Sequence, residues 1–335
     1  MRIFRPADTE YAVAHDGAVF VRIDRGVIRG EGADRLDLLH RLSTNATREL
    51  EAGGETTTIL TTDKGRILEV VRIAAFADHI LMILSGTNVD MVRTWLERYT
   101  IMDDFRTSDV TAGYAVFGVY GGRARSTVSL AIGPDLPDAG SFRQAALDGG
   151  RVVVMRDTRL GGAGGFLLLV DAGAADEVAT RLVATGAREL SSETYEALRI
   201  EAGQPAPGRE LSEQYNPLEA GLVQLVSFTK GCYIGQEVIA RLDSYDKVQR
   251  HLVGLLVDGP LGDDAGDLAV HETATGTAVG SVTSLAWSPS LGRAIALAYV
   301  RTQHAIPGAD VWLSGAGAEE SARVRATITK LPFDR

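Results

Sequence analysis

The chain has few of the residues that cross-link small secreted proteins or hold metal ions. Its 335 residues include one cysteine, Cys232, and six histidines without the spacing of a metal site. A lone thiol excludes a disulfide framework. It also excludes the usual four-thiolate ligation of an iron–sulfur cluster by this chain alone. We therefore expect no metal site.

Long apolar runs and a surplus of basic charge are also missing. No run approaches the roughly 18 residues that a membrane-spanning helix needs, and residues 1–6 lack the apolar core of a signal peptide. Acidic residues outnumber basic ones by 44 to 34, for a net charge of -10, and contacts to nucleic-acid phosphates need basic surface. We therefore expect a cytoplasmic protein that binds no membrane and has no direct nucleic-acid partner.

The first part of the chain has an α+β pattern. With 45% hydrophobic residues, the chain can bury a sizeable core and form two or three domains. Strand-like and amphipathic helical segments alternate in it, which predicts two similar α+β halves. Strands are expected at 19–29, 55–62, 67–75, 79–84, 114–120, 152–156 and 165–170. Helices are expected at 33–42, 174–185, 192–202 and 236–242, and a further helix is expected to run from Thr87 or Asn88 to residue 99.

The last part of the chain has a different pattern. Short β segments are separated there by glycine, proline and aspartate, which predicts a small barrel-like domain after a linker at 243–250. Its strands are expected at 251–257, 278–285, 294–300, 311–314 and 322–331. The glycine-rich run 161–165 has no Lys-Ser/Thr ending, so a hairpin turn is favoured over a phosphate loop.

The most informative segment surrounds the only thiol. It reads Lys230-Gly231-Cys232-Tyr233-Ile234-Gly235-Gln236-Glu237 and precedes a helical pattern. Lys230 favours a thiolate electrostatically, and the amides that open the helix add the positive end of its dipole. The two glycines permit a tight backbone path that presents the sulfur. A reactive Cys232 and a small, buried, apolar Cys232 are both compatible with the pattern.

This octapeptide resembles the signature Lys-Gly-Cys-Tyr-x-Gly-Gln-Glu of the YgfZ-type folate-binding proteins. They are relatives of a mitochondrial iron–sulfur assembly factor and of the T-protein (aminomethyltransferase) of the glycine cleavage system. Other elements similar to the folate family follow in family order. They are Asp63-Lys64-Gly65-Arg66-Ile67, Arg199-Ile200-Glu201-Ala202-Gly203, Thr283-Ser284, Ser288-Pro289-Ser290-Leu291 and Leu331-Pro332-Phe333.

The resemblance implies the fold, the domains and the cofactor. Residues 1–245 would form an aminomethyltransferase-like, folate-binding region of two α+β lobes around a central opening. Residues 250–335 would form the C-terminal β-barrel domain. The implied ligand is tetrahydrofolate or a one-carbon derivative of it.

Three charged residues are the expected folate contacts. A carboxylate matches the amide and amino edge of a pterin, and the resemblance assigns this role to Glu201. A solvated glutamate at a helix end is the alternative. Arg199 belongs to the same element or complements the C-terminal end of its helix. Arg241, with Lys247 and Arg250, either receives the carboxylates of the folate's glutamate tail or forms a solvated basic face.

One position departs from the T-protein pattern. In T-proteins the Gly-x-Ile-Leu element is followed by two aspartates, and the second faces the reactive part of the folate. Here Glu69 and Val70 follow the corresponding residues 65–68. Valine can neither accept a proton nor stabilise an iminium-like charge. Glu69 is one position away and is expected to point to the opposite face of the strand.

The sequence therefore predicts a tetrahydrofolate-binding accessory protein that supports the assembly or repair of iron–sulfur enzymes and, through them, tRNA modification. The protein would be homologous to the aminomethyltransferases but would not itself need to catalyse transfer. Its expected partners are reduced folate and iron–sulfur proteins or their assembly machinery. Gly231 and Gly235 would present the thiol near the folate site, where it could take up a sulfur or iron species or be oxidised reversibly. An active folate-dependent aminomethyltransferase or methyltransferase is one alternative, and a folate-independent scaffold is another. The functional motif is expected to comprise Lys230, Cys232, Tyr233, Gly235, Gln236 and Glu237.

Overall fold

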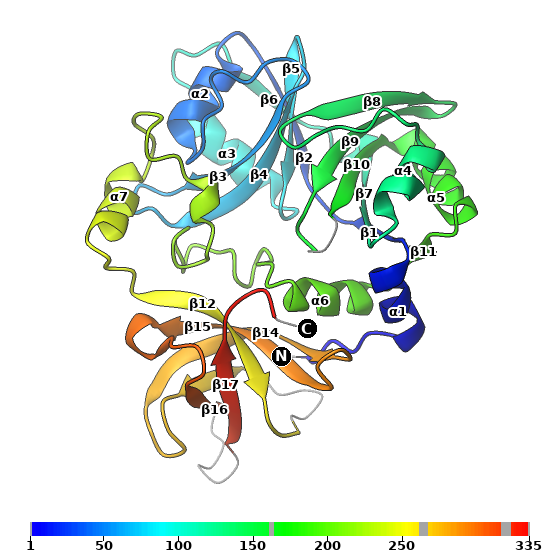
Figure 1. The fold of residues 1–335 in the computed structure, drawn as a ribbon. Coiled ribbons are helices and arrows are strands. Elements are labelled where there is room, and N and C mark those ends of the chain that lie inside the picture. Colours follow the sequence, from blue (N-terminus) through cyan, green and yellow to red (C-terminus); the bar gives the residue numbers. More distant parts are fainter. Residues whose placement is uncertain (1, 161–163, 261–266, 316–322, 334–335) are drawn as a thin grey trace.

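The computed structural model describes residues 2–160, 164–260, 267–315 and 323–333. These residues form three lobes (Figure 1). Two lobes each consist of a β-sheet with its helices, and they lie side by side at the top of the view. The third lobe is a closed barrel below them.

The first lobe consists of a five-stranded sheet and two helices. Its elements are β2 (Val27–Glu31), α2 (Arg35–Leu42), β3 (Glu55–Thr61), β4 (Ile67–Ala75), β5 (His79–Leu84), α3 (Val89–Tyr99) and β6 (Arg106–Asp109). The strands pair antiparallel in the order β3-β4-β5-β2-β6. Leu38 and Leu39 of α2 and Leu96 of α3 pack on Ile73 and Met82 of the sheet. The helices thus cover one face of it.

The second lobe is built on a six-stranded sheet. Its elements are β1 (Val19–Ile23), β7 (Tyr114–Tyr120), α4 (Ala124–Ala131), β8 (Phe142–Leu147), β9 (Gly150–Asp157), β10 (Gly165–Asp171), α5 (Ala175–Ala184) and β11 (Arg188–Glu189). The order is β11-β1-β7-β10-β9-β8, and the β1–β11 pair is parallel. Val128 of α4 and Leu182 of α5 pack on Phe166 and Leu168 of β10.

The two sheets face each other through their remaining apolar side chains. Leu81 and Ile83 of β5 share a buried cluster with Met155 of β9 and with Leu167 and Leu169 of β10. Side chains of a strand alternate between the two faces of a sheet. Strand β10 is therefore apolar on both faces, because one packs on helices and the other on the opposite sheet.

The third lobe is a six-stranded barrel closed in the order β12-β15-β14-β13-β16-β17. Its strands are β12 (Arg250–Val257), β13 (Leu268–His271), β14 (Ala278–Ser288), β15 (Arg293–Arg301), β16 (Asp310–Gly315) and β17 (Val324–Thr329). Leu255, Leu285 and Val300 lie in its core, and Trp287 packs against that core. Closure pairs both edges of the sheet, so the barrel leaves no open edge among these strands.

Helices and one long segment join the barrel to the two sheets. Helix α6 (Ser192–Glu201) packs on β14 and β15 of the barrel, and α1 (Asp8–Asp16) lies beside it (Figure 1). We call residues 202–226, which follow α6, the bridge segment. Its Tyr215 stacks on Tyr299 of the barrel with 3.5 Å between ring centroids. Leu211 and Leu222 pack against Ile59 of β3. Helix α7 (Gln236–Ser244) then leads to β12.

The predicted fold class, α+β with a C-terminal barrel, is confirmed. The single strand expected at 19–29 is wrong, because the chain leaves β1 at Ile23 and enters β2 in the other sheet at Val27. A Cβ on Gly26 would lie 2.4 Å from Cγ2 of Val89, so only glycine fits at this crossing. The sequence also missed α1, α4, β6, β8, β11 and β13.

Other expected boundaries agree closely with the structure. Helix α3 begins after Asn88, although the side chain of Asn88 makes no capping hydrogen bond. Strands β9 and β10 pair antiparallel, as a hairpin requires. The middle of the expected glycine turn, residues 161–163, and the first residue expected in the last strand, Ala322, lie outside the described residues.

Candidate functional site

A cavity of about 400 Å³ lies between the two sheets and the bridge segment. We call it the inter-sheet cavity. Val70, Ile83 and Leu167 give it apolar walls, and Leu211 and Leu222 of the bridge segment also line it. Apolar walls with a few polar groups are typical of a small-molecule site. The charged residues that line it are Arg25, Glu55, Arg72, Arg156, Asp157 and Arg159.

Two of the four arginines are neutralised by carboxylates. Arg72 on β4 forms a bidentate ion pair with Glu55 on β3, with Nε–Oε2 and Nη2–Oε1 distances of 2.7 and 2.8 Å. Nη2 of Arg159 lies 2.7 Å from Oδ2 of Asp157, which also accepts a hydrogen bond from Tyr120 at 2.9 Å. Burial alone would raise the pKa of Asp157, but the ion pair with Arg159 holds this pKa well below its usual range.

The other two arginines have no such partner. Within the described residues, no carboxylate oxygen lies within 4 Å of the guanidinium of Arg25 or Arg156. Nη1 of Arg25 donates to the carbonyl oxygens of Leu84 and Ser85. Burial, and then the charge of Arg159, lower the pKa of Arg25. The guanidinium of Arg156 stacks on Phe166, whose ring faces helices α4 and α5, so it is not counted with the cavity. The three guanidinium groups of Arg25, Arg72 and Arg159, against two carboxylates, leave the cavity with an excess of positive charge.

Val70 and Glu69 have different surroundings, as expected for successive residues of a strand. Val70 lines the inter-sheet cavity, whereas Glu69 lines a neighbouring hollow together with Pro207 of the bridge segment. Oε1 of Glu69 accepts hydrogen bonds from the backbone amides of Ser85 at 2.9 Å and Val70 at 3.1 Å, and from the Ser85 hydroxyl. Burial raises the pKa of Glu69, against the effect of the Ser85 hydrogen bonds.

The motif around the thiol forms an exposed loop. We call residues 230–235 the cysteine loop. Cys232 is exposed, so the interpretation as a buried apolar cysteine is wrong. The loop is fixed by Ile234, whose amide donates to the carbonyl of Arg41 at 3.2 Å and whose carbonyl accepts from the hydroxyl of Thr61 at 2.6 Å. It is thus held against the end of α2 and the β3–β4 hairpin, and Cys232 does not line the inter-sheet cavity.

Lys230 is anchored beside the thiol by contacts with other residues. Its ammonium donates to the carbonyl of His40, and Nε2 of His40 lies 2.9 Å from the carbonyl oxygen of Lys230. The ammonium also lies 4.9 Å from the ring centroid of Tyr233. Burial and the charge of Arg48 lower the pKa of Lys230 to about 8. A role in favouring a Cys232 thiolate stays a prediction.

Gly235 makes the turn into α7 possible. Its φ is +84°, and a Cβ there would lie 2.6 Å from the carbonyl oxygen of Thr62. Gln236 and Glu237 then open α7, as the sequence predicts. Arg241 is exposed on the same helix, so its expected contact with a folate tail stays a prediction.

Glu201 and Arg199 lie at the junction of α6 and the barrel, and both are buried. Oε1 and Oε2 of Glu201 accept from the Tyr11 hydroxyl at 2.7 and 2.9 Å, and Ser288 also donates to it. The interpretation of Glu201 as a solvated residue is therefore wrong. Arg199 lies 2.9 Å from Glu196 and 3.3 Å from Glu210. Glu201 does not line the inter-sheet cavity, and its expected contact with a pterin stays a prediction.

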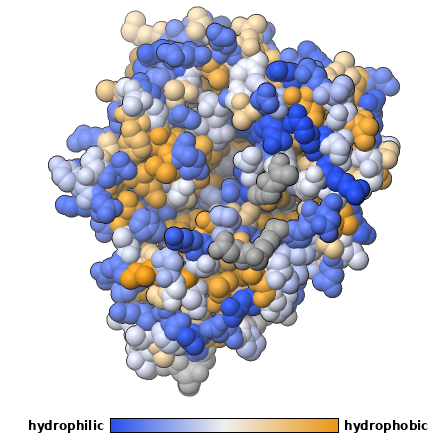
Figure 2. Space-filling view, viewed as in Figure 1, coloured by the Kyte–Doolittle hydropathy of each residue, from blue (hydrophilic) through white to orange (hydrophobic). Residues whose placement is uncertain are grey.

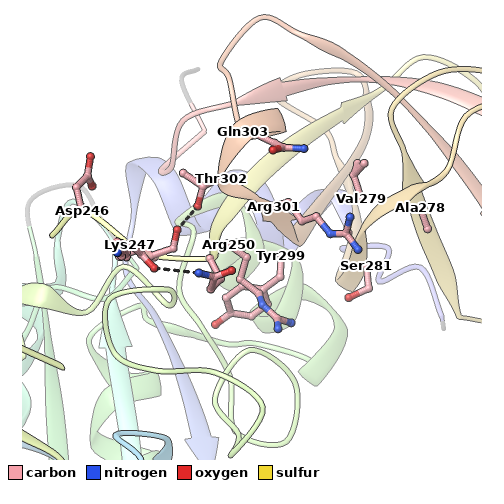
Figure 3. Close-up of a pocket in the computed structure, with 13 residues that line it drawn as sticks. Asp246, Lys247, Arg250, Ala278, Val279, Ser281, Tyr299, Arg301, Thr302 and Gln303 are labelled. Carbon is pink, nitrogen blue, oxygen red and sulfur yellow. Dashed lines mark hydrogen bonds between the residues drawn. The ribbon is translucent and has the colours of Figure 1, made fainter. Parts of the chain in front are cut away.

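A second, more open hollow of about 930 Å³ lies where the linker meets the barrel (Figure 3). We call it the linker groove. Lys247, Arg250, Tyr299 and Arg301 line it, and Figure 3 shows the guanidinium of Arg250 beside the Tyr299 ring. Arg250 is partly neutralised by Glu219, at 3.4 Å. The linker groove therefore presents cations that are largely solvated or already paired.

The molecular surface agrees with a site in the middle of the molecule. In the space-filling view, hydrophobic residues gather around the centre, between the upper lobes and the barrel, and the rim is mostly hydrophilic (Figure 2). The described residues contain no group of three or more histidine, cysteine, aspartate or glutamate side chains placed to hold a metal ion. Within the same residues, no helix is both long and apolar enough to cross a membrane.

Family models match nearly the whole chain. The model described as GCVT N-terminal domain matches residues 11–230, and that of the glycine cleavage T-protein C-terminal barrel domain matches residues 250–334. The chain therefore belongs to the GCVT family of glycine cleavage T-protein-like proteins.

Relatives in this family include proteins named as transferases. The chain is 32% identical over 306 residues to "Putative transferase At1g60990, chloroplastic" of Arabidopsis thaliana, covering 90% of this chain and 69% of that one. It is 30% identical over 334 residues to an aminomethyltransferase of Rubrobacter xylanophilus, covering 97% and 82%. The crystal structure of glycine cleavage system aminomethyltransferase T from Bartonella henselae has the same fold, with a TM-score of 0.84, 18% identity, and 97% and 89% coverage.

The sequence did not reveal the charged lining of the inter-sheet cavity. Arg25, Arg72, Arg156 and Arg159 follow no motif and lie on separate strands or connections. The available signal was weak, because arginines at strand ends are common surface residues. Only the packing of two sheets against each other brings the side chains of Arg25, Arg72 and Arg159 to one cavity.

Proposed function

We propose that the protein binds tetrahydrofolate, or a one-carbon derivative of it, in the inter-sheet cavity and acts as an accessory protein in the assembly or repair of iron–sulfur enzymes. The observation that carries this proposal is the wall position occupied by Val70, at which the T-protein pattern leads us to expect an acid. A valine there can pack against a folate but cannot assist proton transfer.

The charges of the inter-sheet cavity support binding without aminomethyl transfer. Transfer to a folate passes through an iminium-like species, which carries positive charge. The cavity has the guanidinium groups of Arg25, Arg72 and Arg159 and only two carboxylates, both of which are bound to arginines. Like charges repel strongly where water is excluded. The cavity therefore suits a ligand with anionic groups better than it suits a developing cation.

The exposed cysteine loop supports a role toward other proteins. A thiol at the surface can be reached by a partner, whereas a buried thiol is inert. The partners in this proposal are iron–sulfur proteins or their assembly machinery, and the thiol with Lys230 is the functional group that meets them. The protein would act in the cytoplasm, and its effect on tRNA modification would be indirect, through iron–sulfur enzymes that modify tRNA.

Calorimetry and a transfer assay test the folate part. We expect saturable binding of tetrahydrofolate to the wild-type protein and no aminomethyl group transferred from an aminomethyl carrier protein in a single turnover. The absence of saturable binding would support the folate-independent scaffold instead. Efficient transfer would support an active transferase.

Complementation in cells tests the iron–sulfur part. In cells that lack the protein, the wild-type chain should restore the activity of iron–sulfur enzymes, and Cys232→Ala should not. Met102→Ala is a matched control, because Met102 is another sulfur-containing residue at the surface and is 95% exposed. Full complementation by Cys232→Ala would remove the thiol from the proposal.

An active aminomethyltransferase is the second candidate, and Glu69 is the observation that favours it. Its buried carboxyl has a raised pKa, as a general acid or base often does. Several relatives are named aminomethyltransferase. If the single-turnover assay detects transfer, Glu69→Gln should abolish it while leaving folate affinity within about twofold of the wild type.

A further inference from the structure

His40 and Lys230 bind each other although 190 positions separate them in the sequence. His40 lies in the last turn of α2 and is 7% exposed, and Lys230 is the first residue of the cysteine loop. The ring Nε2 of His40 lies 2.9 Å from the carbonyl oxygen of Lys230, and the ammonium of Lys230 donates to the carbonyl oxygen of His40. Each side chain thus binds the backbone of the other residue.

The partners of the His40 ring decide which of its nitrogens carries the hydrogen. Nδ1 lies 3.2 and 3.3 Å from the backbone amide nitrogens of Thr47 and Arg48, and these groups can only donate. The carbonyl oxygen of Lys230 can only accept, so Nε2 carries the hydrogen and donates it. The neutral ring in this tautomer satisfies all three partners. It therefore ties the segment after α2 to the start of the cysteine loop.

The ammonium of Lys230 lies at the C-terminal end of α2. The last carbonyl groups of a helix have no partner within it, and the helix dipole makes this end negative. The ammonium binds one of them, that of His40, and the amide of Ile234 binds the next, that of Arg41. The Ile234 contact joins backbone atoms, so a change of the His40 side chain leaves it in place. Within the described residues, the ring of His40 is the one group that binds the carbonyl oxygen of Lys230.

We propose that His40 is a positioning residue of the functional motif, which fixes the backbone of Lys230 so that its ammonium stays between the end of α2 and the ring of Tyr233. This inference rests on the proposed function, in which Lys230 and Cys232 act together. It adds a residue of α2 to a motif that the sequence places at residues 230–237. Through Lys230, His40 determines how strongly a positive charge favours the thiolate of Cys232.

Substitutions of His40 separate positioning from packing. His40→Phe keeps an aromatic ring and removes both nitrogens. His40→Gln is the rescue variant, because its amide group offers a donor to the carbonyl of Lys230 and an acceptor to the two backbone amides. His271→Phe is the matched control, since His271 is 9% exposed and both of its ring nitrogens bind groups of the barrel. Thermal melting establishes that each variant is folded.

NMR of the methylated Lys230 side chain is the first measurement. Burial and the charge of Arg48 lower the pKa of Lys230 to about 8 in the folded protein. His40→Phe should raise this pKa toward the ordinary value of 10.5, because a released ammonium returns to water. His40→Gln and His271→Phe should keep it at about 8. A pKa that is unchanged in folded His40→Phe would overturn the inference.

The rate at which iodoacetamide alkylates the thiol is the second measurement. Cys232 is the one cysteine of the chain, so the label reports this residue alone. At pH 7, His40→Phe should slow alkylation about threefold, the effect of losing an exposed charge pair, and His40→Gln and His271→Phe should match the wild type. In a Lys230→Met background, His40→Phe should have no further effect. Additive losses would contradict the inference, because His40 would then act on the thiol without Lys230.

Nitrogen-15 NMR of the wild-type His40 ring tests the inference even if His40→Phe does not fold. We expect the hydrogen on Nε2 and none on Nδ1, as the three partners of the ring require. Hydrogen on Nδ1 alone would overturn the inference, because Nε2 could not then donate to the carbonyl of Lys230.

Complementation in cells separates this inference from the proposed function. His40→Phe should restore the activity of iron–sulfur enzymes less well than the wild type, and His40→Gln should restore it. If Cys232→Ala complements fully while the pKa and the alkylation rate respond to His40→Phe as expected, the positioning role stands and the thiol part of the proposed function fails. If Cys232→Ala does not complement and neither measurement responds to His40→Phe, the proposed function stands and the positioning role is wrong.

Discussion

The inter-sheet cavity and the cysteine loop are built in opposite ways. The charged lining of the cavity comes from residues between Arg25 and Arg159 that meet only because two sheets pack together. The cysteine loop is one run of six residues, shaped by Gly231 and Gly235 with φ of +96° and +84°. The cavity combines apolar walls with mostly paired charges, whereas the loop presents an exposed thiol.

This difference suggests that ligand recognition and thiol chemistry are separable in this protein. A short motif can specify a local loop, because its glycines and anchoring hydrogen bonds are close in the chain. A cavity lined by distant residues depends on the whole fold. Changes in the cavity should therefore alter stability and folate affinity, and changes to the exposed side chain of Cys232 in the loop should alter function with small effects on either.

The largest expected effect is on the cavity. Asp157→Ala leaves Arg159 and Tyr120 without their shared partner, and it should lower the free energy of unfolding by about 3 kcal/mol. This value is at the low end for a buried ion pair, since the side chain of Arg159 is 38% exposed. Urea denaturation measures it, and Asp135→Ala, whose side chain is 81% exposed, is the control with a change below about 0.5 kcal/mol.

The pH dependence of this pair has a definite sign. The pKa of Asp157 is lowered in the folded state, so its stabilising contribution is present above the unfolded value of 3.8 and is lost as the pH falls through the folded value. The difference between Asp157→Ala and the wild type should therefore be constant at neutral pH and shrink below about pH 4. A difference that stayed constant into strong acid would contradict the ion-pair explanation.

A smaller effect is expected in the cysteine loop. Gly235→Ala places a Cβ 2.6 Å from the carbonyl oxygen of Thr62 at a positive φ, and it should cost about 2 kcal/mol of unfolding free energy. Gly231→Ala is the matched control. Its φ is also positive, but a Cβ there meets nothing within 4 Å, so only about 1 kcal/mol should be lost. Equal losses would mean that Gly235 is not packed on the hairpin.

The titration of Lys230 is a finer probe of the same loop. Its folded pKa of about 8 lies below the ordinary value of 10.5, because of burial and Arg48. Between these two values the unfolded state binds more protons, so the contribution of Lys230 to stability should rise as the pH increases from about 8 to 10.5. NMR of the methylated side chain measures the pKa directly. Arg48→Gln should raise it, and an unchanged pKa would show that Arg48 is too distant to act.

The smallest effect on stability is expected for Cys232→Ala. An exposed side chain outside the core should change the free energy of unfolding by no more than about 0.5 kcal/mol. Folate affinity by calorimetry should also be unchanged, since Cys232 does not line the inter-sheet cavity. A tenfold loss of affinity would place the thiol at the ligand and break the separation between the two regions.

Much of the fold could be predicted from local patterns. The hairpin of β3 and β4, helix α3 and most barrel strands have clear periodicity, and their limits agree within a few residues. Helix α1 was missed because only Tyr11 of its residues is buried, so no apolar stripe marks it. The crossing at Arg25 was missed because the apolar residues on both sides read as one continuous strand.

The candidate site was only partly predictable for the same physical reason. The cysteine loop and the opposite surroundings of Glu69 and Val70 follow from neighbouring residues, and the sequence anticipates both. The hydrogen-bond partners of Glu201 could not be predicted from neighbouring residues, because Tyr11 is 190 residues away and Ser288 is 87 residues away. Long-range packing also decides which arginines are paired, and no sequence spacing reports it.

A crystal structure of the protein with 5-formyltetrahydrofolate tests the central claim most directly. We expect the ligand in the inter-sheet cavity, with its reactive portion against Val70 and the sulfur of Cys232 out of contact with it. A ligand bound in the linker groove, or a carboxylate side chain placed against the nitrogens that carry the one-carbon unit, would contradict the account.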